Sequence, residues 1–416
     1  MAVQTLTINE TRLEQRLVEL AQIGKIGETG VCRLAHSKED LEAVIAVKKW
    51  MEESGLEVRI DHFGNLIGRL EGENPDAPIL MIGSHIDSQP YGGRFDGTIG
   101  VLGALEVVQI LKEQSFIPKM PIEVISFADE EGCRFNKGLF GVRGILGKLD
   151  DDELDRTDKN GITRREALLK FGCDPTKMKE SEYRPESIAA FLEMHIEQGP
   201  ILDEKEIPVG IVTGISGPLW LTVELEGFAG HAGSVPMNMR KDALVGAAEV
   251  VLALNELASQ DCNAPTVGTV GSLSVFPDSH NSIPEKVRFT IDLRDIDFER
   301  RNRIEAELRV RIKEISKEHK LLCTITEDTN SEPKYCSERI MNILRSESKQ
   351  MGLNPIELMS GPFHDSLVMS TVCEYGMIFV RCKDGISHNP KEYSTFADIS
   401  KGTELLYRTA KHMASE

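Results

Sequence analysis

The sequence has no long apolar run, no closely spaced cysteine pair and no excess of basic residues. No segment approaches the ~18 consecutive apolar residues that a membrane-spanning helix needs. The first twenty residues, MAVQTLTINETRLEQRLVEL, mix charged and apolar residues and lack the uninterrupted apolar core of a signal peptide. The eight cysteines are dispersed without a Cys-x-x-Cys pair, which favours reduced thiols. These absences predict a cytoplasmic protein that binds no membrane.

The balance of charge excludes a second class of partner. Acidic residues outnumber basic ones 67 to 48, which gives a net charge of −19. Such a surface repels the phosphate backbone, so we expect no binding to nucleic acid. With 40% hydrophobic and 28% charged residues the composition is that of a folded globular protein. A length of 416 residues exceeds the roughly 100–200 residues usual for one domain, so we expect two domains.

The first domain shows a β-loop-α-β pattern. The apolar runs Ile79–Ile82 and Ile122–Phe127 are too short for helices and predict buried strands, whereas Thr98–Glu113 has helical periodicity. Units of this kind build parallel sheets covered by helices, and their ligand crevice lies beyond the carboxyl ends of the strands. Both predicted strands run into polar clusters at that point.

The pattern changes between residues 211 and 328. Apolar and polar residues alternate around Leu219–Leu225 and Val287–Leu293, which predicts strands with one buried face. The further predicted elements of this region are helices Asp242–Ser259 and Phe298–Lys320 and strands Gly268–Phe276 and Leu321–Thr326. The resulting β-α-β-β-α-β order is the ferredoxin-like pattern. We therefore predict an α/β domain formed by residues 1–210 and 329–416, with an α+β domain, 211–328, inserted into it.

The segment 150–186 is rich in charged residues and includes the acidic run Asp150–Glu153. Such a run is typical of a solvated excursion, and we assign it no function.

Histidine and carboxylate side chains follow the first predicted strand. The segment GSHIDSQPYGGRFDG, residues 83–97, carries His85 at the strand end and Asp96 just before the helix. Imidazole and carboxylate are suitable ligands for a borderline divalent cation. Asp87, two residues after His85, is well placed to orient the imidazole. A single histidine in such a position is also compatible with a purely structural role.

Two adjacent glutamates, Glu130 and Glu131, follow the second strand in the segment FADEEGCR. Packing gains nothing from them, because like charges repel and burial penalises each carboxylate unless a cation compensates it. A metal ion would remove this conflict, with one glutamate as a ligand and the other facing the water that the metal activates. The alternative is an exposed acidic turn.

Two further histidines bring the number of potential ligands to five. His195 occurs in EMHIEQGP, before the inserted domain, and His388 in GISHNP, after the strand that follows it. This mixture of nitrogen and oxygen donors suits a two-metal hydrolytic centre. The five potential ligands are His85, Asp96, Glu131, His195 and His388.

The segments GSHIDSQPYGGRFDG, FADEEGCRF, EMHIEQGP, GFAGHAGSVPM and GISHNP occur in this order along the chain. Together they resemble the aminoacylase and peptidase T type of two-metal amidohydrolases. Within that group the sequence is most similar to N-carbamoyl-L-amino-acid hydrolases, allantoate amidohydrolases and microbial β-ureidopropionases. The resemblance spans nearly the whole chain. It implies an exopeptidase-like α/β catalytic domain with a mixed sheet and flanking helices, and an inserted domain that serves as lid and dimerisation domain.

The resemblance also implies a role for each ligand. Two divalent ions per subunit would share Asp96 as a bridge, and Glu130 would act as the general base. One ion would also bind His85 and His195, and the other Glu131 and His388. Many peptidases of the group have a carboxylate in place of His195, so the histidine favours the carbamoyl-amide branch.

Substrate contacts are implied for Gln198, His231, Asn281, Arg294 and Gly361. In similar enzymes His231, Asn281 and Arg294 reach the active site of the partner subunit, which implies a homodimer, and His231 stabilises the oxyanion. The planar fork of an arginine suits a substrate carboxylate, and an asparagine amide offers both donor and acceptor to a ureido group. Considered alone, Arg294 is typical of a solvent-facing strand residue.

One loop departs from the family pattern. Related enzymes carry a small Gly-Ala-Gly-His-Asp type loop beside the substrate, whereas this chain has Ser360-Gly-Pro-Phe-His-Asp-Ser366. Pro362 removes a backbone donor, and Phe363 adds bulk where glycine would allow close approach.

We therefore expect metal-dependent hydrolysis of an N-carbamoyl-L-amino acid to the amino acid, ammonia and carbon dioxide. Allantoate and β-ureidopropionate stay open as substrates, because each also presents a carboxylate and a ureido group. A dipeptidase or aminoacylase is a further alternative, and so is a non-catalytic protein that uses its metal centre for binding. Zinc, manganese, cobalt and nickel all accept these ligands, so the metal is left open.

Overall fold

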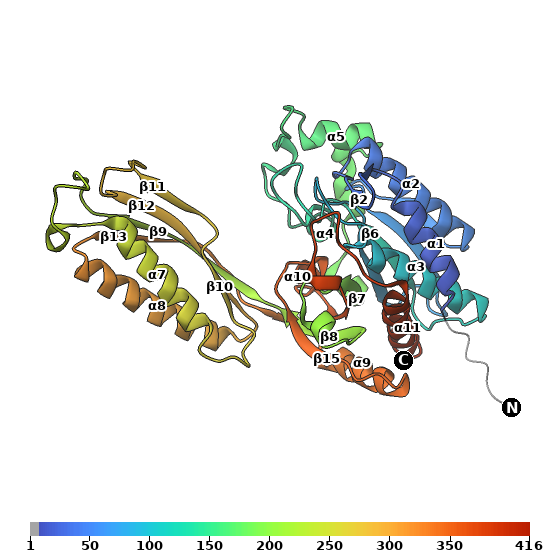
Figure 1. The fold of residues 1–416 in the computed structure, drawn as a ribbon. Coiled ribbons are helices and arrows are strands. Elements are labelled where there is room, and N and C mark those ends of the chain that lie inside the picture. Colours follow the sequence, from blue (N-terminus) through green and yellow to red (C-terminus); the bar gives the residue numbers. More distant parts are fainter. Residues whose placement is uncertain (1–7) are drawn as a thin grey trace. The chain divides into compact units, whose positions relative to one another are not determined.

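The computed structural model describes residues 8–416. Residues 1–7, the start of the segment expected to carry no signal peptide, lie outside this range. The chain divides into two compact units (Figure 1). Unit 1 comprises the chain up to Thr213 with Cys336–Leu358 and Pro362–Glu416, and unit 2 comprises Gly214–Tyr335 with Met359–Gly361. Within the described range no helix has the length and apolarity to cross a membrane.

Unit 1 is built on a mixed β-sheet. Its central strands β16, β7, β5 and β6 are parallel, while β8 pairs with β16 and β4 with β6 in antiparallel fashion. All residues of β5 and β6 are buried, because helices or loops cover both faces of the sheet. The strands are β3 Glu57–Ile60, β4 Leu66–Leu70, β5 Ile79–His85, β6 Ile122–Phe127, β7 Ile188–Ile196, β8 Val209–Ile215, β15 Ile356–Ser360 and β16 Glu374–Val380.

Helices flank this sheet. α3 packs on β5 and β7 and against α11, and on the other side α10 packs on β7 and β16 and contacts α4 (Figure 1). The helices of unit 1 are α1 Glu10–Leu20, α2 Lys38–Glu53, α3 Thr98–Glu113, α4 Phe140–Ile145, α5 Arg164–Phe171, α6 Ile201–Glu204, α9 Glu338–Gln350, α10 Asp365–Met369 and α11 Phe396–Met413. A two-strand hairpin, β1 Lys25–Ile26 and β2 Gly30–Val31, stands outside the main sheet. The predicted mixed sheet with flanking helices is confirmed.

Unit 2 contains a five-stranded antiparallel sheet and two α-helices. β12 pairs with β9 over its whole length, and β13 pairs with the other edge of β9. The inward side chains of β9 and β12 form a core with α7 and α8, which accounts for the alternating pattern in the sequence. The elements are β9 Gly217–Glu226, α7 Ala243–Ala258, β10 Val267–Thr269, β11 Leu273–Phe276, β12 Lys286–Asp295, α8 Phe298–Glu318, β13 Leu322–Asn330 and β14 Lys334–Tyr335.

The charged segment 150–186 was predicted to be a solvated excursion, but two of its charged residues are buried. Glu153 and Arg164 are buried, and Arg164 Nη1 lies 2.9 Å from Asp129 Oδ2. Arg164 Nη2 also lies 3.3 Å from Glu153 Oε1. The prediction was wrong for these residues because their charges compensate one another inside the protein. The segment thus anchors Asp129, the residue that precedes Glu130.

Candidate metal centre

Two buried histidines stand at the ends of neighbouring parallel strands. His85 is the last residue of β5, and His195 is the penultimate residue of β7. Because parallel strands direct their carboxyl ends to the same edge of the sheet, both imidazoles reach one place, with ring centroids 5.8 Å apart. Gly97, with φ of 64°, makes this approach possible, since a Cβ atom there would lie 2.5 Å from the His85 ring.

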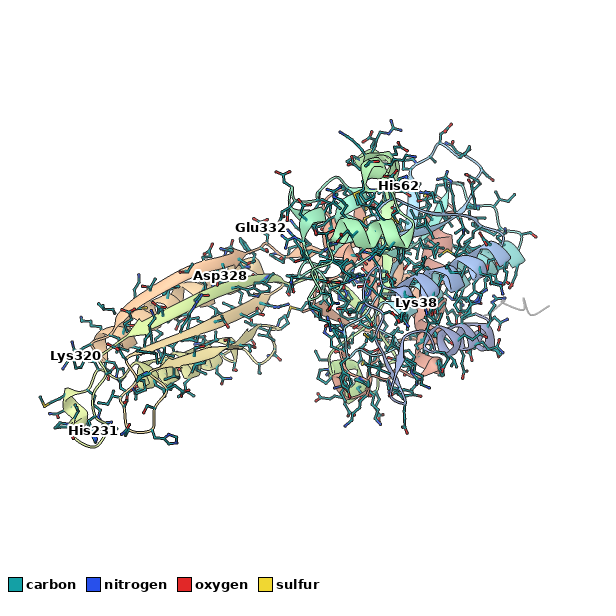
Figure 2. The ribbon with its side chains drawn as sticks, turned by 90° about the horizontal axis from the view of Figure 1, so that it is seen from above. Lys38, His62, His231, Lys320, Asp328 and Glu332 are labelled. Atoms are coloured by element: carbon teal, nitrogen blue, oxygen red, sulfur yellow. The ribbon has the colours of Figure 1, made fainter. Side chains whose placement is uncertain are left out.

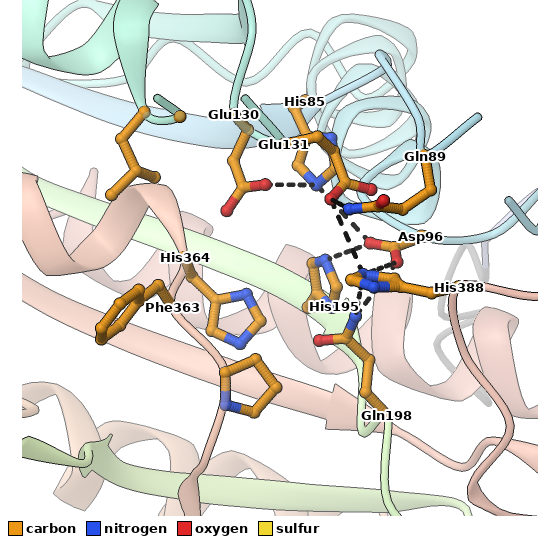
Figure 3. Close-up of a pocket in the computed structure, with 13 residues that line it drawn as sticks. His85, Gln89, Asp96, Glu130, Glu131, His195, Gln198, Phe363, His364 and His388 are labelled. Carbon is orange, nitrogen blue, oxygen red and sulfur yellow. Dashed lines mark hydrogen bonds and ion pairs between the residues drawn. The ribbon is translucent and has the colours of Figure 1, made fainter. Parts of the chain in front are cut away.

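Asp96 lies between two groups of potential ligands. Its Oδ1 is 3.0 Å from His195 Nε2 and 3.6 Å from His85 Nε2. Its Oδ2 is 3.4 Å from His388 Nε2, and His388 Nε2 is 3.6 Å from Glu131 Oε2 (Figure 3). His85, Asp96 and His195 therefore form one group that can hold an ion, and Asp96, Glu131 and His388 form a second.

Asp87 supports this centre through contacts with the ligand-bearing loop and with His85. Its Oδ1 and Oδ2 accept hydrogen bonds from the backbone N–H groups of Glu130 and Glu131, both at 3.2 Å. Its backbone carbonyl lies 3.2 Å from His85 Nδ1. One buried carboxylate thus fixes the loop of the two glutamates and the imidazole together.

The tautomers of the two buried histidines suit metal binding. His85 Nδ1 faces the Asp87 carbonyl, and His195 Nδ1 lies 2.9 Å from the Ile196 carbonyl. A carbonyl oxygen only accepts, so each neutral ring carries its proton on Nδ1 and leaves the Nε2 lone pair for a ligand bond. In agreement, the Gly97 backbone N–H donates to His195 Nε2 at 3.2 Å.

Positive charge does not fully compensate the Glu131 carboxylate of the centre. Burial and repulsion by Asp96 raise the pKa of Glu131 to about 7. Burial also favours the neutral form of Asp96, but His195, His388 and His85, when their rings are protonated, donate hydrogen bonds to it and bring its pKa well below the usual range. The second oxygen of Glu131, Oε1, is buried without a hydrogen-bond partner among the described residues. Divalent cations fit this donor set, because they would supply the missing charge and a partner for Glu131.

Glu130 belongs to neither ligand group. Its Oε2 lies 3.8 Å from His85 Nε2, and its side chain lines the pocket (Figure 3). Burial, together with the charge of Glu131, raises the pKa of Glu130 well above its ordinary value, although His85 opposes this shift. A carboxylate with a raised pKa beside a metal centre is suited to accept and return a proton.

The centre opens into a pocket of about 300 Å³. Its remaining lining residues are Gln89, Gly138, Leu139, Gln198, Pro362, Phe363 and His364. Gln198 was expected to contact substrate, and its Nε2 donates to Asp96 Oδ2 at 3.0 Å. It therefore also supports the residue shared by the two ligand groups.

Several residues that hold the ligands were not predicted from the sequence. Gln89 Nε2 donates to Glu131 Oε2 at 2.5 Å, and the Cys133 thiol donates to Gln89 Oε1 at 2.9 Å. Glu392 Oε1 accepts from the backbone N–H groups of Phe95 and Asp96 at 2.8 and 3.1 Å. Gln89 lies within the first motif, between His85 and Asp96, which was the one local signal for it.

The sequence of this chain is similar to those of known hydrolases. The model of peptidase family M20/M25/M40 matches residues 81–412. The chain belongs to this family. It is 48% identical to an N-carbamoyl-L-amino-acid amidohydrolase of Pseudomonas sp. (strain NS671), over 99% of this chain and all of that protein. It is 36% identical to an allantoate deiminase of Arabidopsis thaliana, over 92% of this chain and 78% of that protein.

Solved structures agree with this assignment. An amidase of the hydantoinase/carbamoylase family from Burkholderia multivorans matches with a TM-score of 0.92 and 34% identity, over 99% of both chains. The predicted resemblance to carbamoyl-amide hydrolases is therefore confirmed.

Unit 2 of this family member carries His231 and Asn281 side by side. The backbone N–H of Ala232 donates to the Asn281 backbone carbonyl at 2.8 Å. His231 forms an isolated antiparallel β-bridge with Ser282, the residue after Asn281. His231 is exposed, and its Nδ1 accepts from the Gly233 backbone N–H at 3.1 Å. In the neutral ring the proton then sits on Nε2, which can donate to an oxygen atom of a ligand.

Arg294 and Gly361 form a separate pair in unit 2. Arg294 Nη1 donates to the Gly361 carbonyl at 2.7 Å, and its Nε and Nη2 bind the Asp292 carboxylate. Arg294 is near the end of β12, whereas His231 and Asn281 precede its start. At ~3.4 Å per residue the ends of this ten-residue strand are roughly 30 Å apart. In Figure 2, His231 accordingly lies at the end of unit 2 opposite Glu332.

Proposed function

We propose that this chain hydrolyses the carbamoyl amide of N-carbamoyl-L-amino acids and releases the amino acid, ammonia and carbon dioxide. The observation that carries the proposal is Glu130, a largely buried carboxylate that lies 3.8 Å from His85 Nε2 and belongs to neither ligand group. The 48% identical relative with that named activity supports the substrate class. The expected enzyme class, a metal-dependent amidohydrolase, agrees with the family and with the ligand groups.

The donor atoms fit two divalent ions, and we propose zinc, manganese, cobalt or nickel. One ion would be held by His85, Asp96 and His195, and the other by Asp96, Glu131 and His388. Bound ions would polarise the carbamoyl carbonyl and lower the pKa of water, so that a nucleophile is available near neutral pH.

The protein's own part in the reaction is proton transfer and orientation. Glu130 would accept the proton of the attacking water and return it to the leaving nitrogen. Its raised pKa matches both tasks, because a weaker acid is a better base and still gives the proton back. His231 Nε2–H would stabilise the developing oxyanion, and the loss of such a donor typically costs ~10²–10³ in rate.

The spacing within unit 2 bears on the expected homodimer. A small ureido acid is far shorter than β12, so one copy of unit 2 cannot bring both His231 and Arg294 to one substrate. Gly361 is bonded to Pro362, which lines the pocket, and its carbonyl binds Arg294. We therefore propose that Arg294 and Gly361 serve their own chain and that His231 and Asn281 come from the partner. This revises the expectation that Arg294 also acts across the dimer.

The alternatives differ in what they predict for turnover. Allantoate and β-ureidopropionate would bind at the same metal centre. The 36% identical allantoate deiminase supports allantoate as an alternative substrate.

A cytoplasmic location stays a prediction, and the eight free cysteines are compatible with it.

A substrate panel tests the proposal. Metal-loaded protein is incubated separately with N-carbamoyl-L-leucine, allantoate, β-ureidopropionate, an N-acetyl amino acid and a dipeptide. We expect the highest kcat/KM, with release of ammonia, for the N-carbamoyl amino acid. Faster hydrolysis of the dipeptide or the N-acetyl compound would contradict the carbamoyl assignment, and faster hydrolysis of allantoate would replace the substrate.

A further inference from the structure

The pocket has an apolar part that the proposed chemistry does not use. Most of its lining residues are polar or charged, but Leu139, Pro362 and Phe363 are not. All three line the cavity, and none of them is fully buried. Apolar surface inside a polar pocket gains from contact with an apolar part of a ligand.

Leu139 has a backbone conformation that leucine rarely adopts. Its φ is 56° and ψ is 31°, in the left-handed region, where a branched residue is unusual. Its backbone N–H donates to the Glu130 carbonyl at 2.9 Å. This hydrogen bond ties the position of the Leu139 side chain to that of the proposed general base, and backbone strain of this kind is concentrated at functional sites.

Phe363 occupies the loop that departs from the small-residue pattern of related enzymes. Figure 3 shows its ring on the side of Glu130 away from Asp96 and His388. A substrate with its carbamoyl carbon at the two ligand groups and its leaving nitrogen at Glu130 would extend its next carbon toward this part of the pocket. That next carbon is the α-carbon, which carries the amino-acid side chain.

We propose that Leu139, Pro362 and Phe363 form an apolar wall that binds the side chain of the substrate. The inference rests on the proposed function and narrows its substrate class to N-carbamoyl amino acids with aliphatic side chains such as leucine, methionine and valine. Compounds without a side chain, such as N-carbamoylglycine and β-ureidopropionate, leave the wall uncovered. Allantoate places a polar ureido group against it, which costs the hydrogen bonds of that group with water.

The test uses the ratio of kcat/KM for N-carbamoyl-L-leucine to that for N-carbamoylglycine, so that a general loss of activity cancels. In the wild type we expect a ratio of at least about ten, since one added methylene group in an apolar pocket is worth roughly 10–200-fold. Leu139→Asn keeps a similar size, tolerates the left-handed backbone and replaces apolar surface by an amide. We expect it to lower the ratio about tenfold. Leu169→Asn, at a leucine that is 57% exposed outside the pocket, is the matched control and should keep the wild-type ratio.

Phe363 provides a second pair of variants in case Leu139→Asn fails to fold. Phe363→Asn should lower the ratio, and Phe363→Leu, which stays apolar, should keep it within about threefold. A wild-type ratio near one, or Asn variants with the wild-type ratio, would overturn the wall. If the wild type hydrolyses neither compound but cleaves another amide, the proposed function itself fails, and the wall fails with it.

Discussion

The Oδ1 atom of Asp96 lies 3.0 Å from His195 Nε2, at the meeting point of a loop and a strand that are about a hundred residues apart in sequence. The other oxygen of Asp96 faces His388, so one carboxylate is shared by two ligand groups. Neither group is complete without it. The two potential ion sites are therefore coupled through a single side chain.

The two adjacent glutamates should separate metal content from turnover. Glu130→Gln removes the proposed base but leaves both ligand groups intact, so we expect wild-type metal content with a loss of roughly 10²–10⁴ in kcat. Glu131→Ala removes a ligand, and we expect it to retain fewer ions per chain. Elemental analysis and kinetics of the same preparations measure both quantities. A metal-depleted Glu130→Gln variant would show that Glu130 is a ligand.

The buried arginine of the charged segment should be important for stability. Arg164→Met leaves Asp129 and Glu153 buried without their shared cation, and breaking such an arrangement typically costs about 3–5 kcal/mol. Arg165→Met, at the next position of α5 and far more exposed, is the control and should change stability by less than about 0.5 kcal/mol. Denaturant unfolding of both variants measures the difference. Equal stability would mean that the segment is dispensable for the glutamate loop.

Metal affinity should rise with pH. In the metal-free protein the pKa of Glu131 is raised to about 7 by burial and by Asp96, and hydrogen bonding to Asp96 raises the pKa of His388. At a pH below these values the ligands hold protons that an ion must displace, so binding weakens as the pH falls and releases protons near neutrality. Calorimetric titrations in buffers of different ionisation enthalpy measure the proton release. An affinity independent of pH between 6 and 8 would contradict the ligand assignment.

Subunit mixing should distinguish the two pairs of residues in unit 2. His231→Ala and Glu130→Gln homodimers should each be nearly inactive, but a mixed dimer would combine an intact metal centre with an intact His231 from its partner. About half of the dimers in an equal mixture would contain one good site, which gives roughly a quarter of wild-type turnover.

Arg294→Ala mixed with Glu130→Gln serves as the comparison. If Arg294 acts in its own chain, no subunit of that mixture has both residues, and no activity should return. Recovery with Arg294→Ala, or none with His231→Ala after proven subunit exchange, would reverse the proposed assignment of cis and trans residues.

Local sequence patterns predicted the elements that position the site. The strand Ile122–Phe127 and the helix Thr98–Glu113 have the predicted bounds, because an apolar run and a helical period are local signals. The predicted strand Gly268–Phe276 is instead interrupted between β10 and β11. Thr269 pairs with Asp292 and Leu273 with Phe289, so β11 is reached with one residue more than β12 supplies, as in a β-bulge.

Long-range contacts around the ligands could not be predicted from the sequence. Arg164 binds Asp129, and Glu392 binds the backbone of Asp96, from positions that no motif connects. Likewise, the hundred-residue separation of Asp96 and His195 closes only when β5 and β7 pair in the sheet. Motifs identified the candidate ligands because ligands recur as residue types at strand ends, whereas their supports depend on tertiary packing.

The most direct test of the account is a metal titration of the chelated protein, followed by ammonia release from N-carbamoyl-L-leucine. After dialysis against a chelator and confirmation of metal loss, we expect no turnover. Adding manganese or zinc should restore it, with full activity at two equivalents per chain, because Asp96 is shared by two ligand groups. Ammonia release by protein proven to be free of metal would contradict the two-metal mechanism.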